Sequence, residues 1–163
     1  MSQSPEVVLR NLLALEIASR QVNSFFDNNA FNISQVWLPL TELVDLRKNN
    51  PQGILYLVSG VSDEGANQSR TAVALRQTNV LFGFQQANVD VKNVSQMDAL
   101  ADLVYQLQIV CRDFKGSGYS WVRTEPARDE NGIPIVYATA HNQGVFEAYF
   151  TAYYNYVVVE GES

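Results

Sequence analysis

The sequence predicts one α+β domain over residues 1–163, in which two long helices pack on one face of a sheet. Two segments carry apolar residues at helical spacing, near residues 5–26 and 95–114, and runs of strand-forming residues stand between and after them. Joined as hairpins, these runs favour an antiparallel or mixed sheet of about five to six strands. The last run, Gly144 to Val159, has bulky aromatic residues at both odd and even positions, so both of its faces need cover.

The first helix and the first strand have clear start signals. Ser4 offers an N-cap hydroxyl, and Pro5 stands at the first helical position. The apolar stripe that follows predicts a helix to about Phe26, where Asp27 and two asparagines end it. A strand is then predicted at Phe31 to Leu38.

A hairpin follows that we expect to project from the domain. Ile54 to Ser59 is an apolar strand, and Thr71 to Gln86 reads as a long strand with a polar start. The segment between them, Gly60 to Arg70, is polar, contains glycine and lacks periodicity, which is typical of a long exposed loop.

The second helix is marked by Ser95, with Asp98 three residues later, as an N-terminal box. Its apolar stripe continues to Phe114. Strands are predicted at Tyr119 to Thr124 and Ile135 to Thr139, before the closing strand. Residues 160–163 are expected to form a disordered tail.

Composition limits the possible functions. The formal net charge of -6 argues against a protein that grips phosphate backbones, because clustered lysine and arginine drive such binding. A mildly acidic surface instead suits the wall of a channel that carries DNA without holding it. No apolar run approaches the roughly 20 residues that span a membrane, and the N-terminus lacks the features of a signal peptide. Cys111, the single cysteine, lies on the apolar stripe of the second helix and is interpreted as a small hydrophobic residue.

The residues give little support to catalysis, and we predict no cofactor and no metal site. His141 is the sole histidine and lies in a polar turn, where an exposed, idle histidine is the favoured interpretation. No glycine-rich phosphate loop is present. The pair Asp90 and Lys92 matches part of a magnesium-dependent nuclease site, with Asp63 or Glu64 as the second acid, and this enzyme remains an alternative.

Apolar and aromatic positions follow a recognisable order along the chain. They run through the N-terminal helix, Phe31 to Pro39, Thr41 to Leu46, the hairpin, Val80 to Gln86, the helix QMDALADLVYQLQIVCRDF, Ser120 to Val122 and the closing strand. This order resembles that of bacteriophage tail terminator, or neck, proteins. The resemblance covers most of the chain and is best from Val80 to Val159. One departure is Thr124 to Asp129, which stands where members of the family carry a proline-rich stretch, and a second is a longer turn at His141 to Gln143.

The resemblance implies a non-enzymatic virion protein that assembles as a ring, commonly of six subunits. Such a ring caps the tail tube protein, stops its polymerisation and docks to the head connector and other neck proteins. Genome DNA passes through the lumen without sequence-specific binding. The protein would be made in the host cytoplasm and end in the tail or neck of the virion, with no role at a membrane. Subunit or lumen contacts are expected at Tyr149, Tyr153, Asp63, Glu64 and Arg70.

Other interpretations stay open. The protein could be another ring of the same joint, such as a connector or head-completion protein. It could also be a monomeric cytoplasmic binding module. In that case the tyrosines of the closing strand would belong to an ordinary core, because tyrosine can bury its ring and keep its hydroxyl in water.

Overall fold

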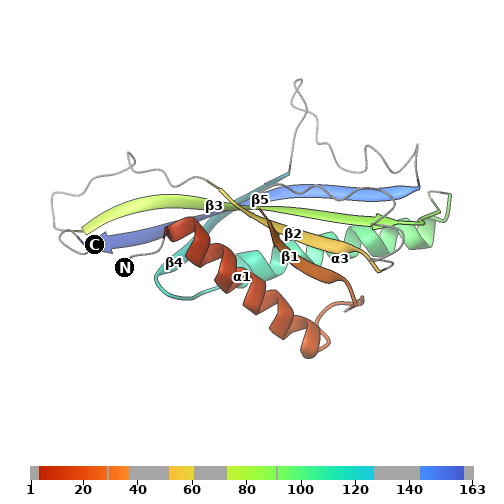
Figure 1. The fold of residues 1–163 in the computed structure, drawn as a ribbon, viewed down its shortest axis with the longest axis horizontal. Coiled ribbons are helices and arrows are strands. Elements are labelled where there is room, and N and C mark those ends of the chain that lie inside the picture. Colours follow the sequence, from red (N-terminus) through yellow and green to blue (C-terminus); the bar gives the residue numbers. More distant parts are fainter. Residues whose placement is uncertain are drawn as a thin grey trace, which may run out of the picture.

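The computed structural model of the protein describes residues 4–28, 30–36, 52–60, 73–90, 92–126 and 144–159. The described strands form one five-stranded mixed sheet, and two helices accompany it, so the predicted α+β class is confirmed (Figure 1). The strand predicted at Ile135 to Thr139 and the tail at 160–163 lie outside the described residues. The elements are α1 (Pro5–Val22), β1 (Asn32–Val36), β2 (Ile54–Ser59), β3 (Val73–Ala87), α3 (Val94–Asp113), β4 (Tyr119–Pro126) and β5 (Val145–Val159).

The sheet is built around a long two-stranded ribbon of β3 and β5. These strands pair antiparallel over 15 residues each, from Val73 opposite Val159 to Ala87 opposite Val145. The strand order is β1-β2-β3-β5-β4, in which β1 and β2 pair parallel and all other neighbours pair antiparallel. The closing strand of the chain therefore lies inside the sheet, between β3 and β4.

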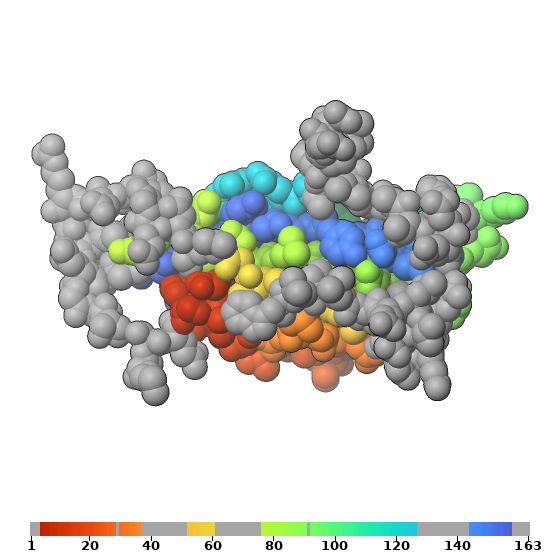
Figure 2. Space-filling model, turned by 45° about the horizontal axis from the view of Figure 1, so that its top comes forward, coloured from red at the N-terminus to blue at the C-terminus, as the bar shows by residue number. Residues whose placement is uncertain are grey.

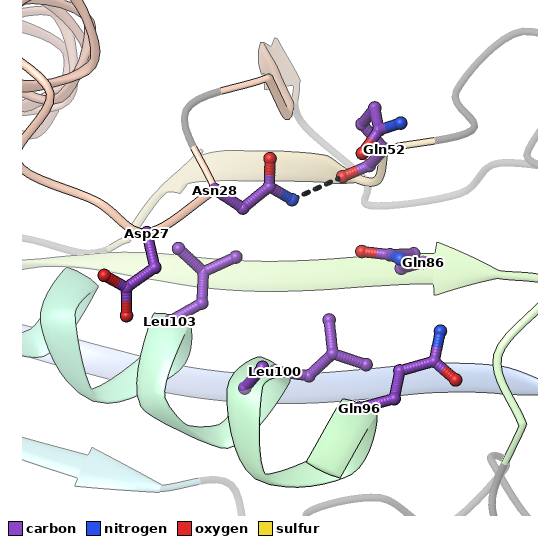
Figure 3. A pocket seen from close by; sticks show the side chains of 8 residues that line it. Asp27, Asn28, Gln52, Gln86, Gln96, Leu100 and Leu103 are labelled. Atoms are coloured by element: carbon purple, nitrogen blue, oxygen red, sulfur yellow. Dashed lines mark hydrogen bonds between the residues drawn. The ribbon is translucent and has the colours of Figure 1, made fainter. Parts of the chain in front are cut away.

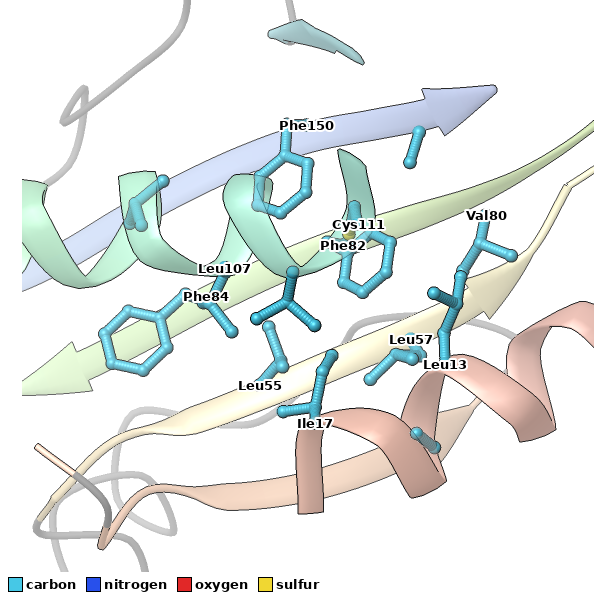
Figure 4. Packing of buried hydrophobic residues seen from close by; sticks show 14 of the residues in the cluster. Leu13, Ile17, Leu55, Leu57, Val80, Phe82, Phe84, Leu107, Cys111 and Phe150 are labelled. Carbon is cyan, nitrogen blue, oxygen red and sulfur yellow. The ribbon is translucent and has the colours of Figure 1, made fainter. Parts of the chain in front are cut away.

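One face of the sheet carries the main core. Both helices lie on the same side of the sheet in Figure 1, and buried residues of both belong to one hydrophobic cluster with alternate residues of β2, β3 and β5. We call this side the helix-covered face and the other side, which no described helix covers, the open face, although residues at one end of it are buried. The cluster includes Leu13 and Ile17 of α1, Leu107 and Cys111 of α3, and Leu55, Leu57, Phe82, Phe84 and Phe150 of the sheet (Figure 4).

Aromatic contacts tie the ribbon to the helices. The rings of Phe82 and Phe150 stack with centroids 4.9 Å apart, across the register pair that joins β3 to β5. Tyr154 is fully buried, and its hydroxyl donates a hydrogen bond to the carbonyl oxygen of Cys111 in the last turn of α3. Carbonyls at the end of a helix lack a helical partner, so this bond satisfies a group that would otherwise be buried alone.

The helix starts differ in part from the predictions. Ser4 is the N-cap of α1, as predicted, although its side chain makes no capping hydrogen bond. The predicted Ser95 N-cap of the second helix is wrong. The N-cap is Asn93, whose side chain accepts a hydrogen bond from the backbone N–H of Gln96 at 3.1 Å. Asn93, two residues before Ser95, therefore caps the free amides at the helix start, and Ser95 lies inside the helix.

The helix and strand ends also shift. The first helix ends at Val22 instead of Phe26, because Ser24 adopts a positive φ of 57° and breaks the helical path. β2 has the predicted bounds, and its antiparallel pairing with β3 confirms the hairpin. Of the predicted loop Gly60 to Arg70, residues 61–70 lie outside the described part. β4 continues past Thr124 to Pro126.

Candidate functional site

The open face of the ribbon is the candidate site, because β5 places its tyrosines Tyr149 and Tyr153 there. Alternate residues of a strand point to opposite faces, and Phe146, Phe150 and Tyr154 belong to the helix-covered core. The odd-numbered residues of β5 from Val145 to Val157 therefore point to the open face. In Figure 2 the blue and green atoms of β5 and β3 form a band across the middle of the view, beside the cyan atoms of β4.

Tyr149 is held in a polar group on this face. It lies opposite Gly83 in the register, and its hydroxyl accepts a hydrogen bond from Nε2 of Gln85 at 2.9 Å. The same nitrogen donates to Oε1 of Glu147 at 3.1 Å. Gln85 is buried, with 7% of its surface exposed. Burial and the neighbouring Glu147 carboxylate raise the pKa of Tyr149, so its hydroxyl stays protonated at neutral pH.

Tyr56 of β2 stands beside this group and is nearly inaccessible. Only 2% of its surface is exposed, and its hydroxyl has no hydrogen-bond partner among the described residues. Burial, with a smaller effect of Tyr149, raises the pKa of Tyr56 to about 12. The side-chain oxygen of Gln85 likewise lacks a partner in the described part of the chain. A small apolar cluster of Ile54, Tyr56, Ala87 and Val145 completes this end of the face.

Tyr153 is held by a different contact. The guanidinium carbon of Arg123 lies 4.0 Å from the centroid of the Tyr153 ring, close enough for a cation–π interaction. Nε of Arg123 also donates to Oε1 of Glu125 at 2.8 Å, with the two side chains 44% and 50% exposed. Such an exposed ion pair contributes less than about 1 kcal/mol, but it orients the guanidinium over the ring.

The predicted site residues are only partly covered by the structure. Tyr149 and Tyr153 share the open face and, being four residues apart on a strand, lie roughly 13 Å from each other. Asp63, Glu64 and Arg70 lie outside the described residues.

Sequence reasoning missed three side chains that hold these tyrosines, namely Gln85, Glu147 and Arg123. Arg123 could have been found from the sequence, because Arg123 and Glu125 stand two residues apart on β4 and therefore share a face of the strand. The register that brings these residues onto the tyrosines is not visible in the sequence.

A pocket of about 300 Å³ lies elsewhere, at the start of α3 (Figure 3). Some of its polar groups are engaged within the protein: Asn28 donates to the backbone oxygen of Gln52 at 3.4 Å, and Asp27 accepts from Gln106 at 3.3 Å. The buried side-chain oxygen of Gln86, another lining residue, has no hydrogen-bond partner among the described residues. The hydrogen bonds indicate a joint between the end of α1, β2 and α3. The lining residues are Asp27, Asn28, Gln52, Gln86, Gln96, Ala99, Leu100 and Leu103.

The described residues that were considered for catalysis have surroundings that indicate a structural role. The Asp90 carboxylate accepts the backbone N–H of Lys92 at 3.0 Å and so shapes the exposed turn before α3. Among the described residues, no group of three or more histidine, cysteine, aspartate or glutamate side chains could hold a metal ion. His141 lies outside the described part. Cys111 is fully buried, and burial raises the pKa of its thiol to about 12.

No helix within the described ranges is both long and apolar enough to cross a membrane. Comparison with models of known protein families and with curated proteins finds no match for this chain.

Proposed function

We propose that the protein is a structural subunit of the bacteriophage head–tail joint. Copies of it would form a ring, with six subunits as the working stoichiometry, that caps the tail tube, stops its polymerisation and docks to the head connector. The observation that carries the proposal is the open face of β5, where Tyr149 and Tyr153 are held in place and partly exposed. The resemblance in apolar and aromatic pattern supplies the phage context.

The chemistry of this face supports a protein contact. Tyrosine and arginine are enriched at the centres of interfaces, and both occur here within one ribbon. Their side chains are already ordered, Tyr149 by Gln85 and Tyr153 by Arg123. Less side-chain entropy is therefore lost when a neighbour covers them.

The charge of the chain supports a ring through which DNA passes. A net charge of -6 disfavours tight binding of a polyanion, which would otherwise stall in the lumen. The proposal therefore includes no sequence-specific contact with the genome.

The test combines sedimentation with electron microscopy. The purified protein, alone and mixed with tubes of its tail tube protein, should form rings or caps at tube ends in negative stain. Tyr153→Asp should weaken this assembly at least tenfold, because it removes the ring beneath Arg123 and adds an acid beside Glu125, whereas Tyr153→Phe keeps the ring and should assemble normally.

Three outcomes would redirect the proposal. A protein that stays monomeric and binds neither tubes nor connector particles is not a neck ring. Binding to connectors with no effect on tubes would instead make it a connector or head-completion ring. If Tyr153→Asp unfolds the protein, as judged by circular dichroism, the tyrosine belongs to an ordinary core.

A further inference from the structure

The pocket at the start of α3 has polar groups at its two ends and an apolar middle. In Figure 3, Asp27 lies at one end beside Leu103, and Gln86 and Gln96 lie at the other end, with Leu100 between them. Both leucines are buried, so the middle of the pocket is formed by side chains of the hydrophobic core.

Gln86 brings an unsatisfied acceptor to its end of the pocket. Residues of β3 alternate between the faces of the sheet, and Phe82 and Phe84 belong to the helix-covered core, so Gln86 also points toward α3. Its Oε1 is buried and has no hydrogen-bond partner among the described residues. A buried acceptor without a partner costs free energy, which an N–H group in the pocket would recover. The side chain as a whole is only partly buried, and the terminal torsion of glutamine is broad, so the amide can turn its oxygen toward such a group.

Asp27 supplies a negative charge at the opposite end. Its Oδ2 accepts a hydrogen bond from Nε2 of Gln106 at 3.3 Å, and no lysine or arginine within the described ranges forms an ion pair with it. The residue is exposed, so its carboxylate is accessible to a cation in solution. Both ends of the pocket therefore offer acceptors, and one of them is charged.

Hydrogen bonds within the protein fix the walls of the pocket. Asn28 donates to the backbone oxygen of Gln52 at 3.4 Å and accepts the backbone N–H of Ala30 at 3.0 Å. Oε1 of Gln96 accepts the backbone N–H of Asp90 at 2.8 Å. These bonds join the segment after α1 to the start of β2, and the segment before α3 to its first turn. The pocket is thus preformed, which reduces the entropy lost when a ligand binds.

The length of the pocket sets the length of the ligand. Gln96 and Leu103 line opposite ends and are seven residues apart on α3, which corresponds to roughly 10 Å along the helix axis. A four-carbon chain with a nitrogen at each end spans roughly 6 Å when extended, and hydrogen bonds of about 3 Å at both ends bring its reach to about 12 Å. A molecule of this kind matches the pocket in length and places its carbons against the leucines.

We propose that this pocket binds a short aliphatic diamine, with one ammonium group donating to Gln86 and the other paired with Asp27. The carbon chain packs against Leu100 and Leu103. An anionic ligand would instead place its oxygens against the acceptors at both ends. The inference does not rest on the proposed function, because the pocket lies on the helix-covered face and the tyrosines proposed for assembly lie on the open face.

Titration of the wild-type protein with butane-1,4-diamine, followed by NMR at low salt, tests the site. Resonances of the Gln86 side-chain amide and of the Ala99 and Leu100 backbone amides should shift and saturate with a Kd of about 1 mM. Butylamine has the same carbon chain and only one ammonium group, so it should bind at least about fivefold more weakly. A titration that shows no saturation up to about 20 mM overturns the proposal, and so does equal binding of the two amines.

Three variants locate the ligand. Gln86→Met removes the acceptor at similar volume and Asp27→Asn removes the charge, and each should weaken diamine binding about fivefold. Asp102→Asn makes the same charge change at an exposed position of α3 that does not line the pocket, and it should change the Kd by less than about twofold.

Two results with these variants would overturn the proposal. If Asp102→Asn weakens binding as much as Asp27→Asn, the diamine is attracted only by the net negative charge of the chain. If Gln86→Met binds the diamine as the wild type does, the acceptor of Gln86 is not part of a site. Urea unfolding should show that Gln86→Met is at least as stable as the wild type, since it loses an unpaired buried acceptor. If this variant does not fold, the comparison of the two amines on the wild-type protein decides.

Discussion

The hydroxyl of Tyr154 is expected to contribute measurably to stability, and Tyr154→Phe isolates it. The substitution removes one oxygen from a fully buried side chain and keeps the ring, which makes an edge contact with Phe114 at 6.1 Å between centroids. The hydroxyl donates to the Cys111 carbonyl, and α3 ends two residues later at Asp113. The variant therefore leaves a buried carbonyl without its partner.

The expected cost follows from that orphaned group. A buried acceptor that loses its partner costs about 1–3 kcal/mol, and we take about 2 kcal/mol here because no water can reach the fully buried site. For a chain of this length, each 1 kcal/mol lowers Tm by about 2–4 °C, so Tm should fall by about 4–8 °C.

Urea unfolding followed by circular dichroism and tryptophan fluorescence measures this difference. Tyr153→Phe is the matched control, since it removes the hydroxyl of the adjacent tyrosine on the open face and should change the free energy of unfolding by less than about 0.5 kcal/mol. The reasoning fails if Tyr154→Phe lies within about 0.5 kcal/mol of the wild type, or if the control loses as much.

Three further predictions follow from single groups. Asn93→Ala should lower the free energy of unfolding by about 1 kcal/mol, measured by thermal unfolding, because it removes the N-cap of α3. Ser95→Ala should lower it far less. If Ser95→Ala is the more destabilising of the two, Ser95 is the cap. Tyr56→Phe should stabilise the protein by about 1 kcal/mol in urea unfolding, since the buried hydroxyl has no partner among the described residues, and a destabilised variant would reveal one. Stability should also fall as pH rises from 10 to about 12, measured by unfolding at fixed urea. Tyr56 keeps its proton in the folded state up to a pKa of about 12, while the unfolded chain releases it near 10.0, so proton release favours unfolding in that window, and Tyr56→Phe should show a shallower fall.

Local patterns predicted the elements well where one signal dominated. The continuous apolar run of Ile54–Ser59 predicts its strand with the observed bounds. The alternation of β5 predicts that Phe146 and Tyr154 share one face and Tyr149 lies on the other, and the structure shows which of the two faces packs in the helix-covered core. Where two residues that can cap a helix stand close together, the local pattern does not decide between them. The box formed by Ser95 and Asp98 looked like a helix start, but the cap nearest to the free amides was Asn93.

Pairing between distant strands could not be predicted from local pattern. β5 inserts between β3 and β4, and that order depends on which edges match in three dimensions. A register shift between Trp121 and Arg123 then brings Arg123 opposite Tyr153. A bulge of this kind re-aims a side chain through a local change in the ladder, which leaves no periodic trace in the sequence. The contacts that hold the tyrosines of the open face therefore came only from the structure.

Because Cys111 is completely buried, the reactivity of its thiol reports how often the packing between α3 and the sheet opens. Thiol reagents attack the thiolate, and with a pKa of about 12 that form is scarce in the folded protein even before access is considered. Alkylation can proceed only when α3 lifts from the sheet, so its rate at neutral pH measures how often the helix layer separates. Because no other cysteine competes, a dye placed through a new surface cysteine would mark one site per subunit, and energy transfer between such dyes would follow the arrival of each copy in an assembly.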